Sequence, residues 1–291
     1  MRYRNPSLNK LQSEYEQQLE RYNSFKGEWN MLIRNFYKKN MGVGLSEGSS
    51  RYQIQIKIEA APDQAFIEII ERNYPNLDFE ELYVLSQYDQ IAKRAMPYYF
   101  HNEAESHLRM SMEYAHYRLK EFDILKLTQS IFPFLEAQNK DVFGCYFLQD
   151  NHIEIYVFPI KLFCILHGLD DNAFFVIVLA HELAHGYNHI GQDKDNRFWY
   201  SFDKTSDNVA EGLAQYYTSK LIDNYLHKEF KLKEVFEKLL YYQPGPYNIF
   251  KTWNLSLEQM YGAFIDARRN DVTAYNIFEA IMAKSKERIK L

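Results

Sequence analysis

The sequence has little cysteine, glycine or proline. Of its 291 residues, 2 are Cys, 11 are Gly and 8 are Pro. Cys145 and Cys164 cannot build a disulfide framework or a zinc site made of cysteines alone, so we expect two buried packing residues in a reducing compartment. Few glycines and prolines mean few sharp turns, which favours long helices.

The sequence also lacks an excess of positive charge and a long apolar run. Its formal net charge is −5, so no overall positive field attracts phosphate backbones, and we expect no nucleic-acid partner. The longest uncharged apolar run, 173–180, is far shorter than the roughly 20 residues that span a bilayer. Residues 1–6 contain no apolar stretch typical of a secretory signal. We therefore expect a cytoplasmic protein that does not contact membranes.

What the chain has in abundance is aromatic residues, with 24 Tyr and 21 Phe. Hydrophobic residues make up 46% of the chain, enough for one large core or two modest ones. Apolar residues recur every three or four positions from residue 9 to about 39, which predicts one long helix. Further helices are expected at 62–72, 78–96 and 103–122. Between the first long helix and these three, residues 51–58 alternate apolar and polar side chains, as in a half-buried strand.

The pattern changes near residue 125, where we place a domain boundary. Residues 1–125 are predicted to form a helical N-terminal region, and residues 126–291 a second domain. In this second domain, helices are expected at 231–242, 256–268 and 272–289. The sequence therefore predicts a mostly helical α+β fold.

Two β-rich runs, 143–148 and 152–158, predict a β-hairpin at the start of the second domain. The short polar link between them contains Asp150 and Asn151. These residue types tolerate the left-handed conformation that a tight hairpin needs.

Three of the 9 histidines crowd into one short segment, His181–His189, which contains the pattern HExxH. A step of four residues turns an α-helix by about 400°, so His181 and His185 project from one face. Two imidazoles so placed can hold one Zn²⁺ at about 2.0–2.1 Å. Glu182 lies about 100° around the helix, where it can take a proton from water that the metal activates. The pattern predicts a zinc site with Glu182 as general base.

The residues before this motif predict a buried helix. Asp170 or Asp171 can cap it, and residues 174–179 are apolar on every side. Two histidines and a glutamate on a buried helix need polar partners, and a metal ion is the simplest one.

A catalytic zinc usually has three protein ligands, so the third ligand decides the class. The extended motif HExxHxxGxxH would need Gly at 188 and His at 191, where the chain has Asn188 and Gly191. His189 shares the face of His181 and His185, but three ligands on one straight helix lie about 12 Å apart end to end. We interpret His189 as a residue that does not bind the metal and either lies near it or faces solvent.

Glu211 is the strongest candidate for the third ligand. It lies in a predicted helix that Ser206 or Asp207 would cap, with an apolar stripe on one side. Its neighbours Gly212 and Ala214 are small, and so are Ala184 and Gly186 beside His185. Small residues would let the two helices approach closely enough to share a metal ion.

The segments HELAH and AEGLAQYY, separated by a polar loop, resemble the gluzincin clan of zinc metallopeptidases, especially its compact members. The resemblance covers about residues 140–225 and includes the hairpin before the HExxH helix. It implies a zincin-like catalytic domain that hydrolyses peptide bonds in a peptide or protein substrate. It also implies one Zn²⁺ per chain, held by His181, His185 and Glu211, with Glu182 as the catalytic base.

The sequence departs from the thermolysin-like pattern at Gln215, where an aspartate would orient a ligand histidine. Either Gln215 itself or Asp207, one turn before Glu211, is a candidate for that role. Four tyrosines are candidate donors to the reaction's oxyanion, although each is also explained as a packing residue: Tyr187, Tyr216, Tyr217 and Tyr261.

The resemblance also predicts where a substrate would bind. An extended peptide would add to the strand at 152–158 through backbone hydrogen bonds. The candidate residues of this edge strand are Ile153, Ile155, Tyr156 and Val157.

Two other functions remain open. The zinc fold could be an inactive scaffold whose N-terminal helices recognise a regulatory protein. A deformylase-like hydrolase would use Cys145 as third ligand in place of Glu211, although residues 143–147 lack the Glu-Gly-Cys-Leu context of those enzymes. A sulfur ligand at about 2.3 Å from zinc would distinguish this class.

Overall fold

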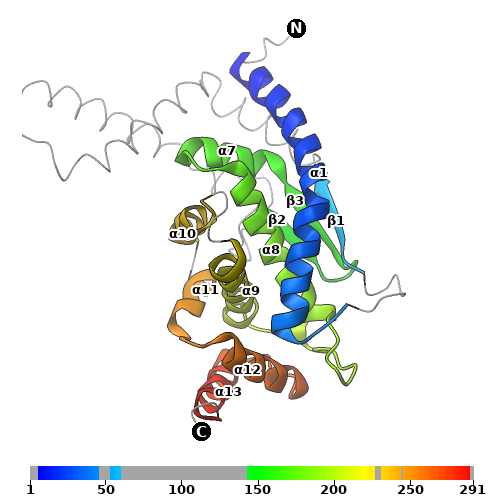
Figure 1. Ribbon diagram of the computed structural model, residues 1–291, viewed down its shortest axis with the longest axis vertical. Coiled ribbons are helices and arrows are strands. Elements are labelled where there is room, and N and C mark those ends of the chain that lie inside the picture. The colour runs from blue at the N-terminus through cyan, green and yellow to red at the C-terminus, as the bar shows by residue number, and fades with distance from the viewer. Residues whose placement is uncertain (1–5, 46–52, 60–142, 227–230, 244, 289–291) are drawn as a thin grey trace, which may run out of the picture. The chain divides into compact units, whose positions relative to one another are not determined.

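The fold is described from a computed structural model (Figure 1). The structure describes residues 6–45, 53–59, 143–226, 231–243 and 245–288. The predicted helices at 62–72, 78–96 and 103–122, and the boundary near residue 125, lie outside these ranges. The chain divides into two compact units, one made of Met1–Tyr22, Ile58–Phe143 and Tyr156–Phe174, the other of Asn23–Lys57, Gly144–Ile155 and Phe175–Leu291.

The described residues are mostly helical and include a three-stranded sheet, which confirms the predicted mostly helical α+β class. The helices are α1 (Pro6–Met41), α7 (Val157–His167), α8 (Asp171–Ile190), α9 (Asp207–Leu221), α10 (Leu232–Tyr242), α11 (Gly245–Asn248), α12 (Leu257–Arg269) and α13 (Tyr275–Arg288). The strands are β1 (Gln55–Glu59), β2 (Gly144–Phe147) and β3 (His152–Tyr156). None of these helices combines the length and the apolarity needed to cross a membrane.

In the first unit, α7 and the start of α8 pack through aromatic rings. Phe143 lies 5.2 Å from Phe163 and 4.8 Å from Phe174, measured between ring centroids. Asp170 caps α8, as its carboxylate accepts a hydrogen bond from the Ala173 amide at 2.9 Å, which confirms one of the two predicted caps. Cys164 is buried here, and burial raises the pKa of its thiol, as expected for a packing residue, whereas Cys145 in β2 is only partly buried and departs from that expectation.

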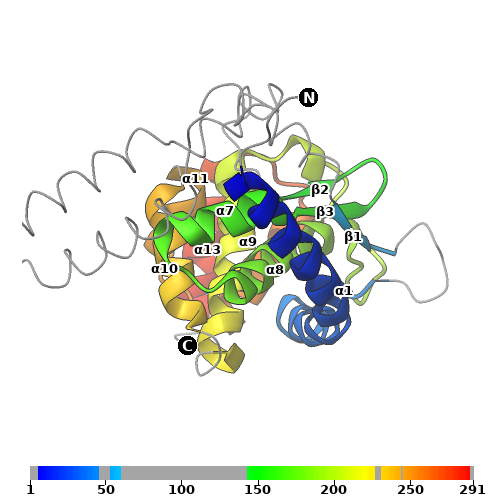
Figure 2. The same ribbon diagram turned by 90° about the horizontal axis from the view of Figure 1, so that it is seen from above.

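In the second unit, β2 and β3 form the predicted hairpin. They pair antiparallel, with Cys145 opposite Glu154 and Phe147 opposite His152. Asn151 in the turn has a φ of 51°, the left-handed conformation that its residue type tolerates. The strand order is β1-β3-β2, and Figure 2 shows β3 between the other two.

The second half of α1 connects the sheet to α8. The buried Tyr37 hydroxyl donates to the Ala180 carbonyl of α8 at 2.7 Å. On the other side, Arg34 donates to the Ile54 carbonyl at 2.9 Å, and Lys26 donates to the Ile56 carbonyl of β1 at 3.4 Å. This part of α1 therefore belongs to the core around the HExxH helix.

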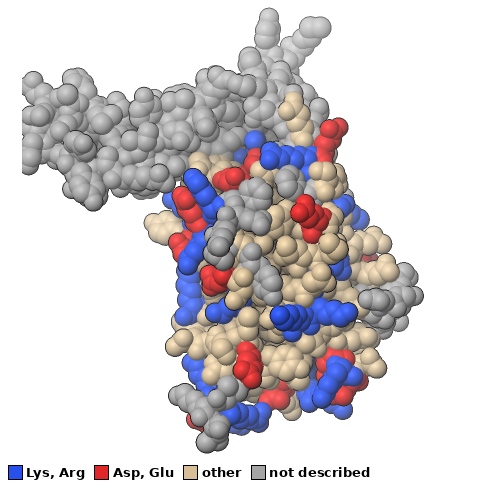
Figure 3. Space-filling model, in the orientation of Figure 1, with Lys and Arg blue, Asp and Glu red and all other residues tan. Residues whose placement is uncertain are grey.

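The C-terminal helices α12 and α13 pack side by side (Figure 1). Ser256 and Gln259 form a capping box that starts α12, with hydrogen bonds of 3.2 and 3.0 Å between side chains and backbone amides. Ser285 of α13 donates to the Gln259 carbonyl at 2.6 Å. On the face in Figure 3, the acidic and basic side chains of the described residues are interspersed.

Arg268 of α12 binds the end of the HExxH helix. Arg268 is 3% exposed, and its guanidinium donates to the carbonyls of Asn188 at 2.7 Å, Arg197 at 3.2 Å and Gly191. Burial lowers the pKa of Arg268 to about 10. A cation at this position satisfies carbonyls that the helix leaves unpaired and opposes the negative end of its dipole.

Replacing Arg268 with Met is expected to lower the free energy of unfolding by about 3 kcal/mol, because buried carbonyls lose their donors. Arg288 is the matched control, since it is exposed and pairs with Asp266 at the surface. Arg288→Met should cost less than about 1 kcal/mol. Urea unfolding measures both, and equal losses would contradict the role given to Arg268.

Candidate metal centre

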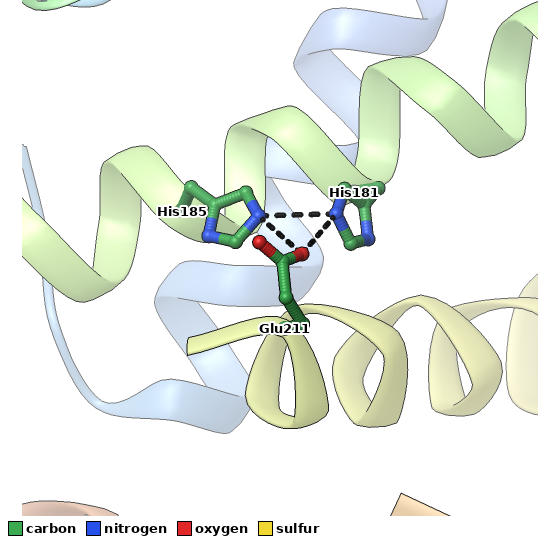
Figure 4. Close-up of side chains that lie close together, drawn as sticks. All are labelled: His181, His185 and Glu211. Atoms are coloured by element: carbon green, nitrogen blue, oxygen red, sulfur yellow. Dashed lines mark hydrogen bonds and ion pairs between the residues drawn. The ribbon is translucent and has the colours of Figure 1, made fainter. Parts of the chain in front are cut away.

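The helices α8 and α9 bring three ligand-type side chains to one point (Figure 4). His181 and His185 project from successive turns of α8, and Glu211 faces them from α9. Glu211 Oε2 lies 3.1 Å from His181 Nε2 and 3.2 Å from His185 Nε2, and the two nitrogens are 3.0 Å apart. His181 and Glu211 are buried. The predicted convergence of these three residues is confirmed, and their spacing allows them to hold a metal ion.

The spacing of the three atoms fits a tetrahedral ion of the size of Zn²⁺. Bonds of about 2.0–2.1 Å at tetrahedral angles place neighbouring ligand atoms about 3.3 Å apart. The distances of 3.0, 3.1 and 3.2 Å are close to this value. A shift of a few tenths of an ångström would complete the coordination triangle.

Protons alone cannot satisfy the three atoms. Each Nε2 carries either one hydrogen or one lone pair, and an ionised carboxylate only accepts. If both nitrogens carry hydrogens, two donors face each other; if neither does, three lone pairs converge. If only one does, the other nitrogen directs its lone pair at the carboxylate. A cation at the centre removes the conflict when both Nε2 atoms carry lone pairs, because it then accepts an electron pair from all three atoms.

Glu211 is held in its ionised form. Burial by itself would raise the pKa of this carboxyl. The charges and hydrogen bonds of His185 and His181 outweigh this effect and bring the pKa of Glu211 well below its usual range. Glu211 can therefore act as an anionic ligand at neutral pH.

Gly186 and Gly212 were expected to let α8 and α9 approach each other, but they make room for other side chains. A Cβ on Gly212 would lie 2.7 Å from atoms of Ile249 and Trp253, and a Cβ on Gly186 would collide with Ile54 of the segment leading into β1. These glycines therefore admit neighbouring side chains to the ligand helices, and the closeness of α8 to α9 does not depend on them.

Glu182 is buried beside the start of β2. It is 6% exposed, and its Cγ lies 3.0 Å from the position of a Cβ on Gly144. The same Cβ would lie 2.7 Å from Val178 Cγ1, one turn earlier on α8. The Glu182 side chain thus passes directly under the backbone of β2, at a residue that has no side chain of its own. Sequence reasoning did not single out Gly144, because nothing local marks it as facing α8.

Gly144→Ala is expected to destabilise the fold by about 1–3 kcal/mol, because the new methyl group overpacks this contact. Val178→Ala in the same chain should recover part of the loss, since it removes the closest atom. Thermal unfolding compares the variants. Gly27→Ala is the matched control, because a Cβ there meets nothing within 4 Å. An unchanged melting temperature in Gly144→Ala would contradict the close contact between Gly144 and α8.

His189 lies apart from the three ligand-type residues. Its Nδ1 is 3.0 Å from the Tyr146 hydroxyl, and its ring stacks on Phe202 with centroids 6.0 Å apart. Burial lowers the pKa of its imidazole. The prediction that His189 does not join the metal group agrees with this position.

The four candidate oxyanion donors have contacts elsewhere or lie at the surface. Tyr187 donates to the Arg34 carbonyl at 3.4 Å, and Tyr216 donates to the Leu255 carbonyl at 3.0 Å. Tyr217 is buried with its ring against Tyr37, and Tyr261 is 40% exposed. The contacts of Tyr187, Tyr216 and Tyr217 are those of packing residues.

The structure places the candidates for orienting a ligand and for capping α9 in different surroundings. Asp207 is exposed in the first turn of α9. Ser206 occupies the N-cap position, but its side chain makes no capping hydrogen bond. Gln215 is buried and directs its amide nitrogen to Gln243 Oε1 at 2.9 Å.

Tyr247 of α11 is a further neighbour of the metal group that sequence reasoning missed. Its ring stacks on the imidazole of His181, with centroids 5.6 Å apart and planes 25° apart. As one of 24 tyrosines, it carries no signal that would have distinguished it.

The predicted edge strand is wrong. β3 lies between β1 and β2, so Ile153 and Ile155 are in the central strand and are fully buried. Tyr156 ends β3, and Val157 begins α7, because Pro159 cannot donate to a sheet but fits the first turn of a helix. Among the described strands, the sheet edges are β1 and β2.

The hydrogen-bond pattern shows which groups β2 presents at its edge. The Tyr156 amide donates to the Phe143 carbonyl at 3.0 Å. Because antiparallel pairs alternate, Cys145 and Phe147 are the next residues to bond β3, while Gly144 and Tyr146 point their amides and carbonyls outward. Side chains alternate as well, so Cys145 faces away from α8, the side that Gly144 faces. Cys145 as third ligand is therefore wrong; Glu211 occupies that place.

Comparisons with protein-family models, with curated proteins and with solved structures found no match. The site is thus defined by its own residues, as a group of two histidines and one carboxylate that could hold a metal ion.

Proposed function

We propose that the protein is a zinc-dependent peptidase of the gluzincin type. The observation that carries the proposal is the meeting of His181, His185 and Glu211 within 3.0–3.2 Å on two buried helices. The HExxH spacing supports it further, because Glu182 is the residue of α8 that follows the first ligand. Its buried position beside β2 suits a base that works next to a bound peptide.

The donor set favours zinc over other common ions. Two imidazole nitrogens and one carboxylate oxygen match zinc sites of hydrolases, whereas Ca²⁺ and Mg²⁺ prefer oxygen ligands throughout. When bound, a zinc ion would supply a water of lowered pKa and would polarise the carbonyl of the substrate.

Glu182 would move the proton during hydrolysis. Its carboxylate takes a proton from the attacking water while the water oxygen forms a bond to the peptide carbon. It then gives this proton to the nitrogen as the C–N bond breaks, so that the products are a carboxylic acid and an amine. A single carboxylate thus acts first as base and then as acid.

The edge of β2 is the surface that best suits an extended peptide. Gly144 and Tyr146 present backbone donors and acceptors there, and a peptide can pair with them as an added strand. Gly144 also lies against Glu182. The bond to be cleaved would therefore lie near the Gly144 end of β2.

Digestion of a mixed peptide library by the zinc-loaded protein tests this function. We expect new termini that appear with zinc, disappear with a chelator and return when zinc is restored. A protein that binds zinc but cleaves no peptide in the library would contradict the proposal. That result would support the scaffold function instead, in which the zinc fold serves recognition of a protein partner.

A further inference from the structure

His181 lacks the hydrogen bond that usually orients a ligand histidine. Such residues donate their second ring N–H to a carboxylate, a carbonyl or water. Here Nδ1 of His181 is buried and has no hydrogen-bond partner among the described residues. Its orientation must come from other contacts, and the ring of Tyr247 is stacked on the His181 imidazole, with centroids 5.6 Å apart.

Tyr247 is held in place by a chain of hydrogen bonds that starts at α9. Gln215, one turn beyond Glu211, donates to Gln243 Oε1 at 2.9 Å. Asn248 donates to the carbonyls of Gln243 and Leu240, both at 3.0 Å. α11, which carries Tyr247, also packs against α9 (Figure 1). The helix that supplies the carboxylate ligand thus also fixes the segment that carries the tyrosine.

We propose that Tyr247 is a positioning residue of the metal centre. Its ring fixes the plane of the His181 imidazole so that Nε2 faces Glu211, and the hydrogen bond between Gln215 and Gln243 holds the ring in place. This inference rests on the zinc-binding part of the proposed function and does not depend on peptidase activity.

The physical basis is the soft rotation of the imidazole. The side-chain torsion χ2 of histidine is broad, so an unsupported ring samples orientations that do not direct Nε2 at the metal. Stacking against a buried ring removes this freedom before the metal binds. Loss of comparable support in metal sites lowers affinity by about 10–100-fold.

Zinc affinity, measured by competition with a chromogenic chelator, tests the inference. Tyr247→Leu should weaken zinc binding at least about 10-fold, whereas Tyr247→Phe, which keeps the ring, should stay within about twofold. Tyr241→Leu is the matched control, because Tyr241 is 80% exposed on α10, and its zinc affinity should not change. The visible spectrum of bound Co²⁺ should also change in Tyr247→Leu and not in Tyr247→Phe.

Gln215→Met provides a second variant that keeps most of the side-chain volume but removes the hydrogen bond to Gln243. It should weaken zinc binding in the same direction as Tyr247→Leu, and the double variant should lose less than the two single losses combined. Circular dichroism tests whether each variant is folded. If Tyr247→Leu is not folded, the zinc affinity of Gln215→Met tests the inference in its place.

The outcomes separate this inference from the proposed function. A wild-type protein that binds no zinc would overturn the proposed function. A wild-type protein that binds zinc, with Gln215→Met or folded Tyr247→Leu unaltered in affinity, would overturn the role of Tyr247 alone. Full loss in Tyr247→Phe would also overturn it, because the hydroxyl and not the ring would then matter.

Discussion

Glu182→Gln is expected to lower peptide cleavage by at least about 10³-fold while the protein keeps its zinc. The amide has nearly the shape of the carboxylate but cannot take a proton from the attacking water. Glu182 is buried beside β2 and lies outside the group of three ligand-type residues. Its replacement should therefore leave the metal group intact, which zinc analysis and a cleavage assay of the same sample would show together.

Glu258→Gln is the matched control for this experiment, because Glu258 is exposed in the first turn of α12. Its cleavage rate should equal that of the wild type. Full activity in Glu182→Gln would show that another residue is the base. Loss of zinc in Glu182→Gln would show that Glu182 belongs to the metal group.

Glu211→Ala is expected to weaken zinc binding by more than about 100-fold, which exceeds the usual effect of removing a residue that only supports a ligand. The variant loses the one anionic side chain of the group and leaves two imidazoles without their carboxylate. Competition with a chelator measures the change. Glu237→Ala, at an exposed position of α10, should bind zinc as the wild type does, and equal affinity in Glu211→Ala would contradict the assignment.

The pH dependence of zinc binding follows from the same residue. A carboxyl whose pKa is lowered by folding contributes stability above the unfolded value of about 4.3, and this contribution is lost as pH falls through the folded value. The pKa of Glu211 lies well below its usual range. Between pH 7 and 5, Glu211 therefore stays ionised, and protonation of this carboxylate should not weaken zinc binding in that range.

Local sequence patterns predicted the elements that carry the site. The spacing of His181 and His185 is a property of one helix, and the apolar stripe around Glu211 is a property of another. Both can be read within a few turns of chain. That the two helices meet could be predicted only because the donor types complement one another around a metal ion.

The strand order could not be predicted in this way. Whether β3 is central depends on β1, which comes from a distant part of the chain and pairs beside it. The same holds for Gly144, whose role follows from its contact with Glu182, and for Tyr247, whose stacking on His181 depends on how α11 packs. These features are tertiary contacts, which hydrophobic periodicity along the chain does not predict.

X-ray absorption at the zinc edge of the zinc-loaded protein tests the central claim most directly, namely that His181, His185 and Glu211 hold one zinc ion. We expect nitrogen and oxygen neighbours only, at about 2.0–2.1 Å, with the outer-shell scattering of two imidazoles. A sulfur neighbour at about 2.3 Å, or a spectrum without imidazole scattering, would contradict it.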